Sequence, residues 1–322
     1  MKLYAPKYYL DFVCIADQCR HSCCVGWEID IDDKTMCRYA SLTEPYAACV
    51  RESIEYGETP HFRLGESERC PHLNDQGLCR IILTLGEDYL CDICREHPRF
   101  YHTTGQGMEV GLGMACEEAC RLILASDDYR TFVEIETLED AGEDEHTDFD
   151  ATAHRARLYE LLSDRTRPYA ERLACIASEY GVTLTQRTDG EWRRLLASLE
   201  YLDEAHRELF HHYCSVAKVE ATNECLAERA LAYFIFRHCS DACDLDELRS
   251  GLGLALLCER LLASLIGSTR AETVESIVEL ARIISEELEY SEDNTQTLRS
   301  AIFDLNYGTN CGIMNPIKDK ET

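Results

Sequence analysis

Ten cysteines stand in two blocks near the start of the chain, and their spacing is that of metal ligands. The first block reads Cys-x4-Cys-x3-Cys-Cys, and the second contains a Cys-x2-Cys and a Cys-x3-Cys step. Such short steps let two thiolates face a common centre, and thiolate is a preferred ligand of zinc and of iron–sulfur clusters. We therefore expect a soft-metal centre to organise the N-terminal third. The blocks comprise Cys14, Cys19, Cys23, Cys24, Cys70, Cys79, Cys91, Cys94, Cys116 and Cys120.

Four thiolates complete a zinc site or a [4Fe–4S] cluster, so the blocks hold enough cysteines for one cluster with a second site, or for one cluster with supporting thiols. Adjacent residues cannot easily both bind one small ion in tetrahedral geometry. The pair Cys23-Cys24 therefore favours a cluster, or two centres, over a lone zinc ion. Zinc is the alternative, and the metal could also serve only to hold the fold together.

The cysteine content also bears on the cellular compartment. The opening MKLYAPKYYLDF has tyrosines and a proline where an export signal needs an unbroken apolar run, and no stretch approaches the ~20 apolar residues of a membrane span. We expect a cytoplasmic protein whose 19 cysteines stay reduced. A secreted disulfide protein is the competing interpretation, but 12 of the 19 cysteines fall in the first 120 residues, which is unusual for a disulfide scaffold of this length.

The net charge of −28 argues against nucleic acid as a partner, because binding to phosphates depends on Lys and Arg, and 32 basic residues face 60 acidic ones. A protein partner with exposed basic side chains fits better, through long-range attraction. General solubility would explain the same charge.

Apolar periodicity predicts a mainly α fold with an irregular Cys-rich domain at residues 1–126, an acidic linker at 127–150 and an all-helical domain at 151–322. The linker holds 11 acidic residues and one basic residue. Seven segments of the last part show apolar residues at three- and four-residue steps. Asp32 or Asp33 is the expected cap of an early helix, while Gly181 and Gly267 are expected at helix ends.

Other features close to the cysteines allow two interpretations each. The glycine-rich stretch from Gly105 to Cys116 resembles a nucleotide-binding loop only weakly, and a tight turn near the metal is favoured. Arg95 and Arg99 could offset cluster charge or bind a carboxylate, and His21 or His97 could bind the metal or a neighbouring group. Further along the chain, Arg237 and His238 interrupt an apolar helix, either as a core ion pair or as a wall of an active site.

Long ordered motifs resemble the flagellin lysine-N-methylase family, within the wider group of zinc- or iron-chelating cysteine-cluster proteins. They are FVCIADQCRHSCCVGWEIDIDDKTMCRY (residues 12–39), CPHLNDQGLCRIILTLGEDYLCDICREHPRFY (70–101) and GLGMACEEACRLIL (111–124). Strong motifs cover about residues 10–125, and the helical half contributes only the stretch YFIFRH (233–238).

The resemblance implies a protein-lysine N-methyltransferase that uses S-adenosylmethionine, possesses a [4Fe–4S] cluster and acts on a protein with exposed lysines such as flagellin. The metal ligands that it implies are Cys14, Cys19, Cys23, Cys24, Cys70, Cys79, Cys91, Cys94 and Cys116. Cys120 departs from the family pattern, where a small apolar residue is expected, and Cys37 and Cys49 also fall outside it.

A lysine amine must be neutral to attack a sulfonium methyl group, so a methylase needs a group that accepts or displaces its proton. The candidates near the motifs cannot be ranked, and the residues for catalysis and for binding S-adenosylmethionine stay unassigned. A non-enzymatic iron–sulfur or zinc-binding module that acts as a carrier, redox partner or docking protein is the alternative. The candidates for the proton acceptor are Tyr8, Tyr9, Glu28, Asp30, Tyr89 and Tyr101.

Overall fold

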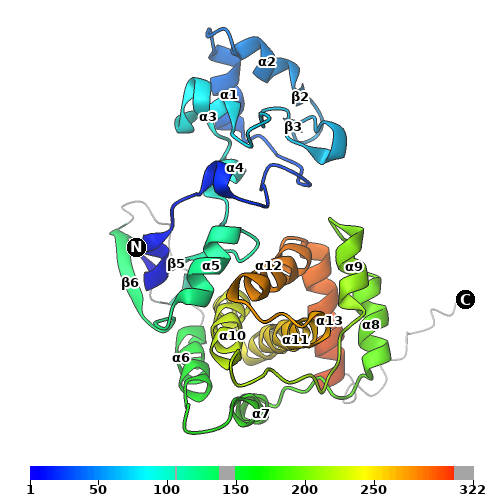
Figure 1. Ribbon diagram of the computed structural model, residues 1–322. Coiled ribbons are helices and arrows are strands. Elements are labelled where there is room, and N and C mark those ends of the chain that lie inside the picture. The colour runs from blue at the N-terminus through cyan, green and yellow to red at the C-terminus, as the bar shows by residue number, and fades with distance from the viewer. Residues whose placement is uncertain (106, 138–148, 308–322) are drawn as a thin grey trace, which may run out of the picture.

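The computed structural model describes residues 1–105, 107–137 and 149–307, and within them the predicted mainly α class is confirmed (Figure 1). A small Cys-rich lobe stands at one end of the molecule, a four-stranded sheet lies at one side, and a helical body fills the rest. The predicted domain boundaries at 126 and 150 stay predictions. Most of the predicted acidic linker, residues 138–148, lies outside the described residues.

The sheet has the strand order β4-β5-β1-β6 and joins segments that are far apart in the sequence. Its strands are β1 (Lys2–Pro6), β4 (Arg99–Thr104), β5 (Gly107–Leu112) and β6 (Phe132–Thr137). β1 runs parallel to β5 and antiparallel to β6, and β4 and β5 form an antiparallel hairpin. Burial alternates along β4, as expected for a strand with one face on the core.

The lobe contains short helices around its own hydrophobic cluster, which includes Ile31, Tyr39, Val50, Phe62 and Ile81. The side chain of Asp32 accepts the N–H of Thr35 and caps α1, as predicted. The elements of the lobe are α1 (Asp33–Ser41), α2 (Ala47–Glu52), β2 (Ile54–Glu55), β3 (His61–Phe62), α3 (Arg80–Leu85) and α4 (Asp92–Glu96), with 3-10 turns at Ala16–Gln18, Glu66–Glu68 and Glu87–Tyr89.

The helical body packs around the antiparallel pair α10 and α11, and its core extends to α5 (Glu117–Ala125) and to the inner face of the sheet. A 3-10 turn at Lys7–Asp11 follows β1. The remaining helices are α6 (Ala151–Leu162), α7 (Tyr169–Tyr180), α8 (Asp189–Ala197), α9 (Glu204–Phe210), α10 (Glu224–Cys239), α11 (Leu245–Thr269), α12 (Val274–Glu289) and α13 (Glu292–Tyr307).

Three local predictions for this body need comment. One of the seven predicted segments, residues 191–210, is two helices, because the chain turns after Ala197 and Asp203 caps α9 by accepting the N–H of Ala205. Gly181 ends α7 in the left-handed conformation, as predicted. The prediction for Gly267 is wrong: α11 continues to Thr269, and Thr273 caps the next helix.

By length and composition alone, α11 could cross a membrane, so the expectation that no stretch approaches that limit is too strict. Of its most apolar 18-residue window, 89% is buried inside the protein. This burial is what the central helix of a compact fold shows.

Buried ion pairs connect the layers. Arg155 of α6 donates to both carboxylate oxygens of Glu109 on β5 and stacks on the ring of Phe132, 4.4 Å from its centroid. Glu228 of α10 accepts from Arg165, Arg172 and Tyr129. Because a buried charge is costly without a partner, these pairs fix how the sheet and α6 sit on α10.

Candidate metal centre

The nine predicted metal ligands separate into two groups in the structure. The first is the lobe group, whose five members all belong to the hydrophobic cluster of the lobe: Cys24, Cys70, Cys79, Cys91 and Cys94. The second is the junction group, which comprises the start of α5 and the segment before the lobe that Arg20 and His21 tie to the helical body: Cys14, Cys19, Cys23 and Cys116. All nine are free thiols, and so is Cys120.

The lobe group is held together by backbone pairing as well as by packing. The N–H of Cys70 donates to the carbonyl of Cys24 at 2.9 Å, and Cys79 pairs with Leu73 in an isolated β-bridge. The sulfur atoms of Cys91 and Cys94 lie 3.9 Å apart. Cys70 and Cys91 are buried. Segments from four places in the sequence therefore bring five thiols into one small interior.

Three of the nine cysteines stand immediately before helices. Cys79, Cys91 and Cys116 are the N-cap residues of α3, α4 and α5. Burial raises the pKa of Cys116, and the N–H groups of Ala119 and Glu118 oppose that rise. Burial likewise raises the pKa of Cys79 against the N–H groups of Ile82 and Ile81. The positive end of a helix stabilises thiolate, the form that binds metals.

Contact with a neighbouring thiol lowers the pKa of two further lobe cysteines, Cys24 and Cys91. The Cys23 thiol donates to Cys24 and lowers the pKa of Cys24 to about 7, with Arg69 adding a smaller effect. The thiol of Cys94 lowers the pKa of Cys91 in the same way. Burial raises the pKa of Cys70 to about 12. The thiols of Cys23 and Cys24 therefore interact directly, and so do those of Cys91 and Cys94.

The junction group is formed by residues 14–23, which we call the strap, lying over the N-terminus of α5. The thiol of Cys19 donates to the carbonyl of His21 at 2.8 Å and lies 3.7 Å from Oε2 of Glu117. Burial raises the pKa of Cys19 to about 11. Cys14 and Cys23 are exposed, whereas Cys70 and Cys91 of the lobe group are buried and its other three thiols are half-buried.

Ion pairs fasten the strap to the body. Arg20 donates its Nε to Glu117 at 2.7 Å, and His21 Nε2 lies 2.8 Å from Glu279 on α12. Trp27, just beyond the strap, packs edge-on against Tyr290, with ring centroids 5.0 Å apart. These contacts place the junction group against the body rather than inside the lobe.

A buried polar network lies behind the junction group, and sequence reasoning found only one of its members, His238. Nε2 of His238 lies 2.8 Å from Oε1 of Glu289, and Tyr233 donates to Oε2 at 2.7 Å. The Tyr233 oxygen also accepts the N–H of Met114, two residues before Cys116. Of the two interpretations left open for His238, the structure supports a core contact with the carboxylate of Glu289, but burial lowers the pKa of His238, so the ring is not held in its charged form. Arg237 lies over the ring of Phe100, 4.2 Å from its centroid.

The middle of the glycine-rich stretch forms the strand β5, and the helix α5 follows it, so the stretch is not a loop between a strand and a helix. Packing explains two of its glycines. A Cβ on Gly111 would collide with Phe100 and Phe236, and one on Gly113 would collide with the Tyr290 hydroxyl. The stretch thus lets the backbone pass close to aromatic side chains on its way to Cys116, as a tight approach near the metal requires.

The six candidate proton acceptors do not converge on one point. Tyr8 is buried in the main core, whereas Glu28 and Asp30 are exposed on the lobe. Tyr89 is half-buried there, and its carbonyl accepts from the Tyr39 hydroxyl. Sequence proximity to the cysteine motifs therefore does not select one of these four.

The other two candidates, Tyr9 and Tyr101, lie near Arg99. Tyr101 is 45% exposed and donates to Glu96 Oε2 at 2.7 Å, and Glu96 and burial raise its pKa. Arg99 donates to the Tyr9 hydroxyl at 2.8 Å, while Arg95 pairs with Asp92. An exposed tyrosine bonded to a carboxylate can hold an ammonium group, so Tyr101 and Glu96 are the pair best suited to meet a lysine.

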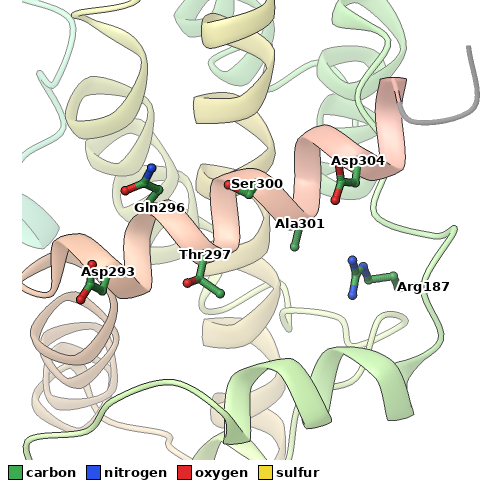
Figure 2. Close-up of a pocket in the computed structure, with 7 residues that line it drawn as sticks. All are labelled: Arg187, Asp293, Gln296, Thr297, Ser300, Ala301 and Asp304. Carbon is green, nitrogen blue, oxygen red and sulfur yellow. The ribbon is translucent and has the colours of Figure 1, made fainter. Parts of the chain in front are cut away.

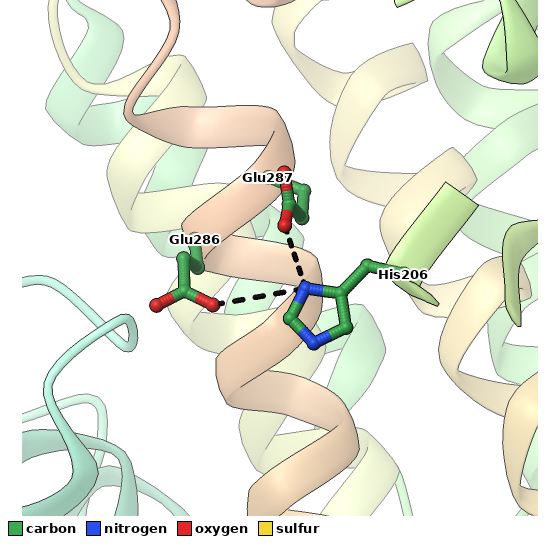
Figure 3. A group of neighbouring side chains, drawn as sticks. All are labelled: His206, Glu286 and Glu287. Carbon is green, nitrogen blue, oxygen red and sulfur yellow. Dashed lines mark hydrogen bonds and ion pairs between the residues drawn. The ribbon is translucent and has the colours of Figure 1, made fainter. Parts of the chain in front are cut away.

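Two further features of the body lie apart from the cysteines. His206 Nδ1 is 2.6 Å from Glu287 and 3.9 Å from Glu286 (Figure 3). Glu287 also accepts the N–H groups of Leu202 and Asp203, and Arg282 pairs with Glu286. The group therefore anchors the start of α9 to α12.

A groove of about 460 Å³ runs along α13 (Figure 2). Arg187 faces Asp304 across it, and the other lining residues are Asp293, Gln296, Thr297, Ser300 and Ala301. None of the predicted metal ligands or proton acceptors lines it.

Comparison with known proteins identifies relatives of one kind. Over 130 residues, 38% of this chain, it is 31% identical to lysine-N-methylase of Salmonella choleraesuis (strain SC-B67) and of Salmonella typhimurium (strain LT2). It is 30% identical to the flagellar biosynthetic protein FliU of Salmonella muenchen over a match of the same length. The match covers 32% of each lysine-N-methylase and 77% of FliU. No family model and no solved structure matches the chain.

Proposed function

The chain belongs to the flagellin lysine-N-methylase family, and from this membership we propose that it methylates lysine side chains of a protein, with S-adenosylmethionine as the methyl donor. Flagellin is the first candidate substrate, because one relative is named a flagellar biosynthetic protein. The observation that carries the proposal is this relationship together with the nine gathered thiols that match the family motifs.

The proposal includes an iron–sulfur cluster on the N-terminal cysteines. The donors fit, because the thiols are free and three of the cysteines stand at the N-cap positions of helices. Among the described residues only the His206 group brings three possible ligand atoms within 4.8 Å of one another. A zinc ion with bonds of about 2.3 Å would hold its sulfur ligands about 4 Å apart. The sulfur atoms of Cys91 and Cys94 are 3.9 Å apart, which also suits zinc, so the family resemblance and not the spacing favours a cluster. A cytoplasmic, reducing location would keep such a cluster intact.

The acidic surface supports a lysine-bearing substrate. A net charge of −28 attracts basic segments over long range and raises their local concentration. For transfer to occur, the lysine ammonium must lose its proton before the nitrogen attacks the sulfonium methyl carbon, and the thioether product then leaves. Tyr101 with Glu96 is the exposed pair that could hold the ammonium group and accept that proton.

The test uses the full chain purified without oxygen. Iron and sulfide are measured first, then binding of S-adenosylmethionine by calorimetry, then transfer of labelled methyl groups to flagellin by mass spectrometry. We expect about four iron and four sulfide for each cluster, donor binding, and methylated lysines. Iron without donor binding would contradict the proposal and favour a redox or carrier module. Zinc without sulfide would show that the cysteines hold zinc and not an iron–sulfur cluster.

A further inference from the structure

We propose that His72 is a positioning residue for the metal that the lobe cysteines bind. It holds Cys70 and Cys79 in place by fastening the chain between them to α2, and it is not itself a ligand. The inference rests on the part of the proposed function that places a metal on the N-terminal cysteines, and it does not depend on methyl transfer.

The backbone of His72 is bonded to the surroundings of both cysteines. The N–H of Leu73 donates to the carbonyl of Cys70 at 3.1 Å and closes a turn around His72. The carbonyl of His72 accepts the N–H of Arg80, the residue after Cys79, at 2.7 Å. Leu73 also pairs with Cys79 in the β-bridge of the lobe. A shift of His72 would therefore move both Cys70 and Cys79.

The side chain of His72 fastens this turn to both ends of one helix. The ring is 0% exposed, with Nδ1 2.8 Å from the Tyr46 hydroxyl and Nε2 2.9 Å from the Ser53 hydroxyl. Tyr46 and Ser53 are the residues that flank α2 at its start and at its end. Phe62 packs edge-on against the same ring, with centroids 4.6 Å apart. The position of the turn is therefore set by α2 and by the core of the lobe.

The hydrogen bonds also fix the proton on the ring. The Ser53 hydroxyl donates to the carbonyl of Val50 at 2.7 Å, so toward His72 its oxygen can only accept. Nε2 therefore carries the hydrogen, and Nδ1 accepts the hydrogen of the Tyr46 hydroxyl. Neither ring nitrogen keeps a lone pair for a metal. His72 can thus orient the ligands on either side of it without joining them.

The deciding experiment compares variants of the full chain purified without oxygen. His72→Phe keeps a ring in the core but deletes both hydrogen bonds. His72→Gln is the conservative variant, because its amide can accept from Tyr46 and donate to Ser53. The matched control is His61→Phe, which changes a half-buried histidine of β3 whose ring contacts the Thr59 carbonyl, away from the cysteine turn.

Three quantities are measured: the rate of metal release to a chelator, the absorption spectrum of the bound metal, and helicity by far-ultraviolet circular dichroism. If the centre holds zinc, Co²⁺ replaces it for the spectrum. We expect His72→Phe to release metal about tenfold faster than the wild type and to alter the spectrum, because groups that orient ligands typically contribute 10- to 100-fold to metal affinity. His72→Gln should recover most of the difference, and the control should match the wild type.

A wild-type release rate in His72→Phe overturns the proposal, and so does an equal effect in the control. Faster release with an unchanged spectrum also overturns it, because His72 would then only stabilise the lobe. If His72→Phe loses helicity, Ser53→Ala takes its place, since it removes only the acceptor of Nε2, and the same outcomes decide. A wild type without metal would contradict the proposed centre itself, whereas a loaded wild type with unaffected variants contradicts only the role of His72.

Discussion

Arg20 and Glu117 hold the strap on the first turn of α5. Arg20 donates its Nε to Glu117 Oε1 at 2.7 Å and its backbone N–H to Oε2 at 2.8 Å. Each partner is the direct neighbour of a junction thiol, Cys19 on the strap and Cys116 on α5. The pair therefore sets the spacing of two cysteines that are far apart in the sequence.

Loss of this clamp should weaken metal binding, because Cys19 and Cys116 are candidate ligands of the proposed cluster. We expect Glu117→Ala to release metal about tenfold faster in a chelator assay, because groups that orient ligands typically contribute 10- to 100-fold to metal affinity. The control is Arg121→Ala, which removes an ion pair contained within α5. Equal release rates for both variants would show that the clamp does not orient the thiols.

The buried network of Tyr233, Glu289 and His238 should be a major source of stability. Tyr233→Phe deletes a donor to Glu289 and an acceptor for the Met114 N–H, so we expect a loss of about 1–3 kcal/mol in the free energy of unfolding. Glu289→Ala leaves His238 unpaired and should cost about 3–5 kcal/mol. Urea titration measures both, and losses under 0.5 kcal/mol would contradict this role.

Burial of His102 should make stability depend on pH. The ring packs between Phe100 and Phe236, and burial lowers its pKa to about 4. The groups facing it are Asp241, 3.9 Å from Nδ1, which raises the pKa, and Arg237, Arg155 and His238, which lower it.

The sign of the effect follows from the two pKa values. In the unfolded chain the pKa of a histidine is about 6.5, so below that pH the unfolded state binds a proton that the folded state does not. The stabilisation present at neutral pH is then lost as the pH falls toward 4. We expect a loss of about 2 kcal/mol at pH 5 from this residue. Urea titrations at pH 7 and pH 5 should show a smaller fall for His102→Phe than for the wild type.

Gly113 should tolerate no side chain, because a Cβ there would collide with the Tyr290 hydroxyl and lie 3.3 Å from the Pro98 carbonyl oxygen. We expect Gly113→Ala to lower the free energy of unfolding by about 1–3 kcal/mol and to reduce the metal bound per chain, because Cys116, a candidate ligand, follows three residues later. Gly105→Ala is the control, since no atom lies within 4 Å of its added Cβ. If the two variants lost the same free energy of unfolding and the same amount of metal, the collision at Gly113 would not be the cause.

Local signals predicted much of the fold. The apolar periodicity of the second half, the cap at Asp32 and the helix end at Gly181 each depend on a few neighbouring residues, and each is confirmed. The sheet was not predicted, because β1 pairs with β5 more than 100 residues later and with β6 beyond it. Pairing between such distant strands leaves no periodic pattern in the residues around either strand.

The candidate site, too, was predicted only in part. Spacing alone identified the cysteines as candidate ligands, whereas their separation into two groups depends on the fold, which brings Cys116 to the strap. Glu289 and Tyr233 were missed because each looks like one more helical residue until α10 and α12 pack together. An acidic residue on an otherwise apolar helical face was the signal available for Glu289.

The position of Cys116 has a consequence for the order of assembly during synthesis. A chain emerges from its N-terminus, so every lobe thiol through Cys94 is available before α5 exists. The thiols of the lobe can therefore come together on the nascent chain, whereas Cys14, Cys19 and Cys23 of the strap lack Cys116 until α5 has been made. The full set of nine candidate ligands is complete only after α5 has formed, so a cluster that used Cys116 would be assembled after the lobe had folded.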